Sequence, residues 1–150
     1  MPQSFGSIHI HLVFSTKGRE PWVKPDITSR LFEYIGGTLR SHKCVLLDAG
    51  GMPDHLHLLI SISREMSASE LSRIVKANSS RWIHETYADM AYFEWQSGYG
   101  AFSVSFSGLN EVKRYIDRQE EHHREMTFQD ELRLLLKKHK LEWDERYVWD

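Results

Sequence analysis

The chain has 150 residues, enough for one domain with a genuine hydrophobic core. Hydrophobic residues make up 41% of it and charged residues 27%, as in ordinary globular proteins. A single cysteine, Cys44, excludes an intrachain disulfide and a cysteine-based zinc site. Because no apolar run approaches ~20 residues and no signal-peptide pattern is present, we expect a cytoplasmic protein with no membrane partner.

The net charge of −2 hides an uneven distribution along the chain. Residues 1–81 carry 10 Lys and Arg against 7 Asp and Glu, a balance of +3. Residues 82–150 carry 9 against 14, a balance of −5. The total taken alone argues against a nucleic-acid partner, but this asymmetry permits a local basic face on an acidic protein.

The first third of the chain predicts a strand, a helix and a second strand. Residues 8–14 alternate and are rich in β-forming side chains, so they predict a strand. Apolar residues at helical spacing predict a helix over residues 26–43. Residues 44–47 are an apolar run typical of a buried strand, which we expect to end at Gly50 and Gly51.

Residues 55–63 predict a third strand, because apolar and polar side chains alternate there. The apolar set is Leu56, Leu58, Ile60 and Ile62, and the polar set is His55, His57, Ser61 and Ser63. Ser67 and Glu70 then form a capping box that begins a helix reaching about Tyr87.

The remaining elements complete a familiar order. Residues 101–106 predict a fourth strand, followed by a helix to roughly Arg124 and another over residues 128–140. The order βαββαβ is typical of an α+β, ferredoxin-like sandwich, in which a four-stranded antiparallel sheet carries two helices on one face. We expect a single domain over residues 1–150, with a core of about 5–125 and a C-terminal helical appendage over 126–150.

The sharpest chemical feature is His55-Leu56-His57 on the third strand. A spacing of two places both imidazoles on one face of the sheet, about 7 Å apart along the strand. Both rings are then able to converge on one divalent ion, although two polar residues on a solvated face give the same pattern. A third ligand is still required.

Tyr115 and Gln119 lie four residues apart and therefore on one face of a helix. Their spacing fits a nucleophile beside a metal ligand, and it equally fits an amphipathic tyrosine at the edge of a core. Two sets of basic side chains are suited to hold phosphates, although each is also common as plain surface: Lys17 and Arg19 after the first strand, and Arg73, Lys76 and Arg81 on the second helix. No glycine-rich phosphate loop is present, so we expect no nucleotide cofactor.

Four ordered segments resemble the HUH single-tyrosine transposases of small bacterial insertion sequences, a family close to the REP-associated tyrosine transposases. The matching segments are His11–Lys17 with Arg19, Pro53–Leu59, Trp95–Val104, and Tyr115–Gln119 with His122 and His123. The resemblance covers roughly residues 5–140. It implies a ferredoxin-like fold and a DNA transposase that cleaves and rejoins single-stranded DNA bearing hairpins.

The resemblance also implies roles for individual residues. Tyr115 would attack a phosphodiester to give a 5′-phosphotyrosine and a free 3′-OH. His55, His57 and Gln119 would bind a divalent metal, Mg²⁺ or Mn²⁺, of which Mn²⁺ tolerates nitrogen ligands better. The family acts as a homodimer, and often the tyrosine helix of one subunit completes the histidine site of the other. The five basic residues named above are the candidates for contacts to the DNA backbone.

Two other functions are compatible with the sequence. One is a domesticated relative that binds hairpin DNA as a regulator without cutting it, although binding alone requires neither the tyrosine nor the histidines. The other is a ferredoxin-like metal-sensing or oligomerising protein, which leaves Tyr115 without a role. The chain is also more acidic than is usual in this family, and we expect the acidic face to point away from DNA. The residues that crowd it are Glu120, Glu121, Glu125, Asp130 and Glu131.

Overall fold

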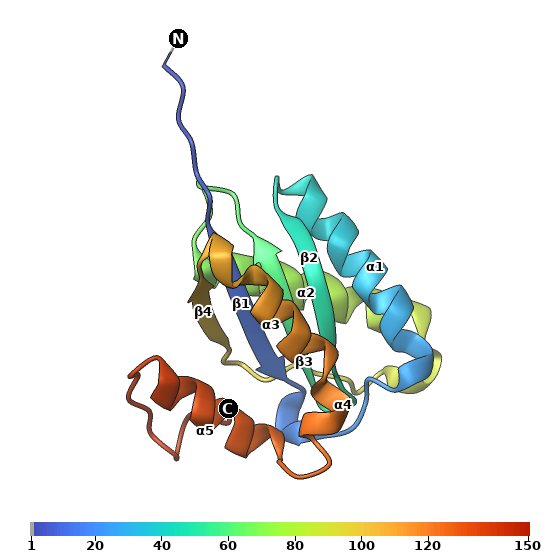
Figure 1. The fold of residues 1–150 in the computed structure, drawn as a ribbon. Helices are drawn as coiled ribbons and strands as arrows, with labels where there is room; N and C mark the ends of the chain where they lie inside the picture. Colours follow the sequence, from blue (N-terminus) through green and yellow to red (C-terminus); the bar gives the residue numbers. More distant parts are fainter. Residues whose placement is uncertain (1) are drawn as a thin grey trace.

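A computed structural model describes residues 2–150 and contains one antiparallel sheet with strand order β2-β3-β1-β4 (Figure 1). The strands are β1 (His9–Ser15), β2 (Val45–Met52), β3 (His55–Ser61) and β4 (Gly100–Val104). The helices are α1 (Pro25–Ser41), α2 (Ala68–Thr86), α3 (Leu109–Asp117), α4 (Gln119–His122) and α5 (Phe128–Lys138). Three short 3-10 turns are η1 (Lys17–Arg19), η2 (Ala88–Met90) and η3 (Phe106–Gly108). This is the α+β, ferredoxin-like order expected from the sequence.

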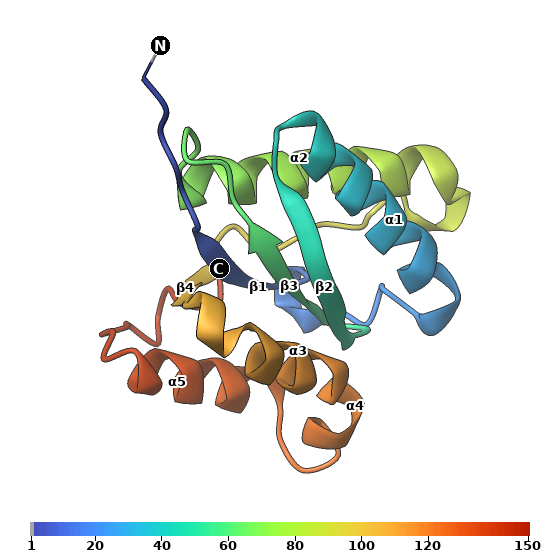
Figure 2. The same ribbon diagram turned by 45° about the horizontal axis from the view of Figure 1, so that its top comes forward.

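The two faces of the sheet carry different helices. Helices α1 and α2 lie on one face, and α3, α4 and α5 lie on the other (Figure 2). The main core fills the space between the sheet and the first pair, and it includes Leu12, Phe14, Leu31, Ile35, Leu56, Leu58, Ile60, Leu71 and Val75. The cap of α2 is as expected, since the Ser67 side chain accepts a hydrogen bond from the Glu70 backbone N–H.

The second strand is longer than the sequence predicts. Strand β2 continues through Gly50 and Gly51, which pair with His57 and Leu56 of β3. A side chain at Gly50 would place its Cβ 2.7 Å from the backbone oxygen of Ile116 in α3. Gly50 therefore serves close packing of α3 on the strand rather than a turn.

The predicted helix through Arg124 is divided in two. Helix α3 ends at Asp117, and Arg118 has φ −102° and ψ 22°, outside the helical range. Helix α4 then begins at Gln119, whose side chain is 2% exposed. No proline or glycine marks the break, so the buried contacts of Gln119 outweigh local helix propensity.

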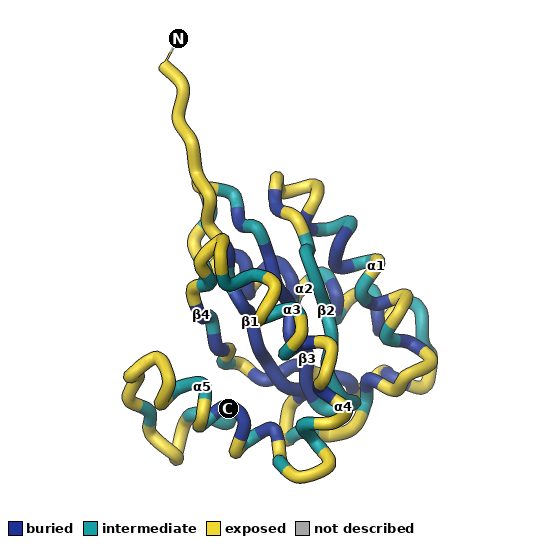
Figure 3. Tube along the Cα trace, viewed as in Figure 1, coloured by how far each residue is buried: buried dark blue, intermediate teal, exposed yellow. Residues whose placement is uncertain are grey.

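The face of the sheet that carries the histidines is covered rather than solvated (Figure 3). A second apolar cluster of Val13, Phe102, Phe128 and Leu132 joins β1 and β4 to α5. His55 and His57 are both fully buried beneath these helices. Along residues 2–150, no helix combines the length and the apolar composition needed to cross a membrane.

Candidate active site

Strand β3 aims both histidines at helix α5. The neighbouring positions Leu56 and Leu58 point into the main core, so the alternation of the strand turns His55 and His57 to the opposite face. There they meet the carboxylate of Glu131. One ligand atom from each of these three residues lies within 4.8 Å of the other two.

Helices α3 and α4 bring Tyr115 and Gln119 to the same place. The Tyr115 hydroxyl donates a hydrogen bond to Glu131 Oε2. Gln119 Oε1 lies 3.0 Å from His55 Nε2, and its amide group donates to Glu131 Oε2 at 3.0 Å. The structure thus brings Tyr115, His55, His57 and Gln119 together within one chain.

Glu131 is the centre of this cluster. Its Oε1 lies 2.9 Å from His57 Nε2, 3.4 Å from His55 Nε2 and 3.1 Å from His123 Nε2. The side chain is 1% exposed, and a carboxylate buried to that degree requires such partners. Helix α5 is fixed over the sheet by these bonds as well as by its apolar contacts.

Each histidine of the pair has a further partner on its other ring nitrogen. Asp54 Oδ1 lies 2.7 Å from His55 Nδ1, and His11 Nε2 lies 2.8 Å from His57 Nδ1. Partners of this kind fix the ring orientation and the tautomer of metal-binding histidines. Both Nε2 atoms are therefore held pointing at Glu131.

The two histidines of the pair titrate differently. Burial lowers the pKa of His55, but hydrogen bonds to Asp54 and Glu131 outweigh it and raise that pKa to about 9. Burial lowers the pKa of His57, and it lowers that of His11, beside His57, to about 3. The hydrogen bonds with Asp54 and Glu131 therefore favour the cationic form of His55.

The same network holds Tyr115 as a neutral phenol. Burial, and then the negative charge of Glu131, raise the pKa of the Tyr115 hydroxyl well above its ordinary value. Burial opposes ionisation of Glu131, but hydrogen bonds from His123, His55 and His57 outweigh it and lower its pKa. The phenol therefore needs additional positive charge nearby before it ionises.

The residues present fit a divalent cation. Two imidazole nitrogens and a carboxylate oxygen converge on one position, with the amide oxygen of Gln119 beside them. This mixed nitrogen and oxygen set suits Mn²⁺ or Mg²⁺, and the buried carboxylate supplies the opposite charge.

The five basic candidates for DNA contacts do not form one group. Lys17, Arg73 and Lys76 line a common cavity of about 610 Å³, in which Lys17 pairs with Glu94. Lys76 donates hydrogen bonds to three backbone carbonyls, those of residues 96–98, and burial lowers its pKa to about 8.

The other two lie outside that cavity lining. The Arg19 guanidinium lies over the ring of Trp149, 5.8 Å from its centroid, and Arg81 donates a hydrogen bond to Asn78 on its own helix. Helix α2, which carries three of the five candidates, lies across the sheet from α3, which carries Tyr115 (Figure 2).

The sequence predicts an outward acidic face that includes Glu131, and for this residue the prediction is wrong, because its side chain is 1% exposed. Four acidic neighbours are exposed: Glu120, Glu121, Glu125 and Asp130. Glu131 instead lies on the buried stripe of α5 between Phe128, Leu132 and Leu135. A carboxylate inside an apolar stripe of helical spacing was the available signal.

Two solved structures resemble the chain. A candidate transposase from Deinococcus radiodurans R1 aligns with a TM-score of 0.63 and 20% identity, over 79% of this chain and 98% of its own. A REP-associated tyrosine transposase bound to a REP hairpin aligns with a TM-score of 0.57 and 13% identity, over 82% and 73%. At these identities the two structures support the fold.

The family follows from sequence comparison. No curated protein matches the chain. The family model described as "Transposase IS200 like" matches residues 4–119, a span that holds the whole sheet, the histidine pair, Tyr115 and Gln119. Because the match covers most of the chain, the protein belongs to the IS200-like transposase family.

Proposed function

We propose that this transposase cleaves and rejoins single-stranded DNA beside a hairpin through a 5′-phosphotyrosine on Tyr115, assisted by a divalent metal. The observation that carries the proposal is the meeting of the Tyr115 hydroxyl, the histidine pair and Glu131 in one cluster. A binding protein has no need of a buried phenol held against a set of metal-ligating atoms.

In the proposed reaction the Tyr115 oxygen attacks phosphorus and the bond to the 3′ oxygen breaks. The phenol loses its proton, and the departing strand takes one to end in a 3′-OH. Glu131 holds the phenol by accepting its hydrogen bond, but the lowered pKa of this carboxyl makes it a weak base. Rejoining reverses these steps and needs no nucleotide, because the phosphotyrosine retains the phosphodiester energy.

His55 and His57 would hold the metal, with oxygen ligands from Gln119 and Glu131. When bound there, a divalent ion supplies the positive charge that polarises the phosphodiester and favours the phenolate. Asp54 and His11 keep the two histidine rings turned toward it.

The proposed substrate is hairpin-bearing single-stranded DNA, and the proposed assembly is a homodimer. The similar fold of a tyrosine transposase bound to a REP hairpin supports the first part. Tyr115 reaches the histidines of its own chain, which supports catalysis within one subunit. Mixed Tyr115→Phe and His57→Ala subunits should then fail to restore each other's activity, whereas an exchanged tyrosine helix would restore part of it.

The test is covalent capture of DNA. Labelled hairpin oligonucleotides with single-stranded flanks, carrying the end sequences of the DNA element on which this transposase acts, are incubated with the protein and Mn²⁺ or Mg²⁺. A denaturing gel then separates free DNA from a protein–DNA adduct. We expect an adduct that disappears in Tyr115→Phe and on chelation, while Tyr92→Phe, at an exposed tyrosine away from the site, leaves it intact.

Cleavage that persists in Tyr115→Phe would overturn the mechanism. Tight hairpin binding without any adduct, across both metals and with the correct end sequence, would favour the non-cleaving regulator instead.

A further inference from the structure

A groove begins at Tyr115 and extends beyond the residues that take part in the proposed reaction. It lies between α3, α5 and strand β4 and has a volume of about 630 Å³, within the range of ligand pockets. Tyr115, His11 and Glu131 all stand in its wall. A DNA strand bound along this groove would therefore lie next to Tyr115.

The walls of the groove carry positive charge without partners. Arg114 and Arg118 on α3 and Lys138 on α5 line it and are exposed, and within residues 2–150 none of them forms an ion pair. Glu111 is the exposed carboxylate that opposes them. Lys17 and Lys76, by contrast, are engaged with Glu94 and with backbone carbonyls.

The floor of the groove carries aromatic rings. Phe102 and His11 are buried at the base of the groove, 6.2 Å apart between ring centroids. The exposed ring of His139 covers Phe102 at 4.7 Å between centroids, so His139 presents the ring surface there. The Tyr115 ring lies 4.7 Å from that of His122 in the same wall. Rings beside unpaired basic groups are the combination that holds single-stranded nucleic acid, by base stacking and phosphate contacts.

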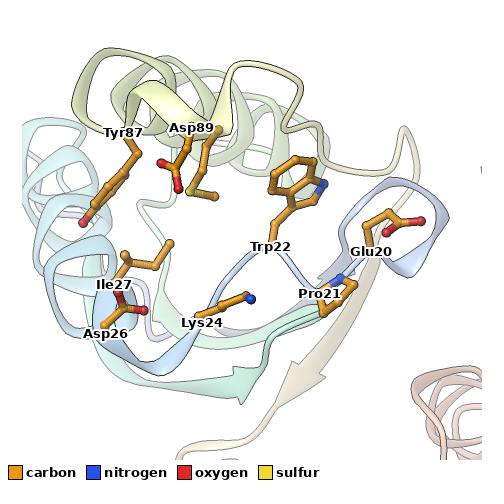
Figure 4. Close-up of a pocket in the computed structure, with 9 residues that line it drawn as sticks. Glu20, Pro21, Trp22, Lys24, Asp26, Ile27, Tyr87 and Asp89 are labelled. Carbon is orange, nitrogen blue, oxygen red and sulfur yellow. The ribbon is translucent and has the colours of Figure 1, made fainter.

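A second cavity shows the opposite character. It is about 360 Å³ in volume, and its walls carry the carboxylates of Glu20, Asp26 and Asp89 against the single ammonium group of Lys24 (Figure 4). Such walls repel phosphate.

We propose that the α3–α5 groove binds the single-stranded DNA flanking the scissile phosphate, with Arg114, Arg118 and Lys138 on its phosphates. The proposal rests on the proposed function and deepens it, since it places the substrate strand on the histidine face of the sheet. The DNA contacts expected from the sequence at Arg73, Lys76 and Arg81 lie on the other face.

The test measures binding in EDTA, so that no cleavage intervenes. The affinity for fluorescein-labelled dT12 is measured at a series of salt concentrations, for the wild-type protein and for the double variant Arg114→Ala/Lys138→Ala. The control, Arg64→Ala/Lys137→Ala, removes the same charge from exposed sites outside the groove lining, one of them next to Lys138 on α5. Thermal unfolding verifies that both double variants are folded.

The logarithm of the binding constant falls linearly with the logarithm of the salt concentration. Each lost phosphate contact makes this negative slope shallower by about 0.7 for single strands. We expect the groove variant to lose about 1.4 in slope and the control less than about 0.4. Equal slopes for wild type and groove variant, or an equal loss in the control, would overturn the proposal.

Photocrosslinking gives a second readout. With 5-iodouracil in the same oligonucleotide, we expect crosslinked peptides from residues 102–115 and 134–139. Crosslinks confined to α2 would refute the groove. The proposed function and the groove proposal can fail independently. If an adduct forms but DNA binding does not depend on the groove, only the groove proposal is refuted. If DNA binds in the groove but no adduct forms, only the phosphotyrosine mechanism is refuted.

Discussion

Gly50→Ala tests whether the packing of α3 on β2 positions the nucleophile. The added Cβ would lie 2.7 Å from the Ile116 carbonyl oxygen and 2.9 Å from Ile116 Cγ2. Ordinary van der Waals contact begins near 3.4 Å, so α3 must move by about 0.7 Å at the residue that follows Tyr115. Overpacking of this kind costs about 2 kcal/mol, or about 4–8 °C in Tm for a chain of this length.

The same shift should slow adduct formation. A misplacement approaching 1 Å at a reacting group costs about 100-fold in rate, and we expect a loss between 10-fold and 100-fold. The matched control is Gly37→Ala in α1, where the added Cβ finds its nearest atom at 3.8 Å and removal of a helical glycine stabilises by about 0.5–1 kcal/mol. If Gly50→Ala retained both its Tm and its adduct rate, the packing of α3 on β2 would not be what places Tyr115.

Three further predictions address metal, pH and the loop before β4. Mn²⁺ at 100 times its Kd should stabilise the protein by about 2.7 kcal/mol, which raises the Tm by about 5–10 °C. In His57→Ala, Mn²⁺ should not change the Tm relative to that of the metal-free variant. An equal rise in the variant would show that the metal binds elsewhere. Burial and the neighbouring Asp117 carboxyl raise the pKa of Asp48 to about 6, so the folded state is penalised as pH rises from about 4 to 6, fully so above pH 6. Asp48→Asn should therefore stabilise the protein by about 1 kcal/mol at pH 7.5, after allowance for partial exposure, and should have no effect at pH 3.5. Denaturant titrations that show a larger stabilisation at pH 3.5 than at pH 7.5 would contradict the raised pKa of Asp48. Lys76→Met should lower the free energy of unfolding by about 1–2 kcal/mol, because the ammonium group holds three backbone carbonyls of residues 96–98, and an unchanged denaturation midpoint would contradict that role.

Most of the fold follows from local patterns in the sequence. The alternation over β3 separates Leu56 and Leu58 from His55 and His57, and the structure places the two sets on opposite faces. For β2 the sequence predicts too short a strand, because Gly50 and Gly51 are typical of a turn. Gly50 is needed where Ile116 of α3 approaches, a contact across 66 residues that no local pattern carries.

The candidate site, like the fold, is predicted only in part from local patterns in the sequence. His55 and His57 follow from strand periodicity, and Tyr115 and Gln119 from helical spacing together with a family resemblance. Glu131 was missed because its role depends on how α5 packs over the sheet, which short-range periodicity does not determine. The acidic composition of the second half concealed it among exposed neighbours.

The most direct test of the central claim is the mass of the adduct peptide. Trypsin cleaves after Arg114 and Arg118, so Tyr115 lies in the four-residue peptide of residues 115–118. After incubation with metal and cleavable DNA, followed by nuclease and trypsin, we expect this peptide to carry a nucleotide joined through its 5′-phosphate. A DNA adduct on any other residue, or an unmodified 115–118 peptide recovered from purified adduct, would contradict the assignment of Tyr115 as the nucleophile.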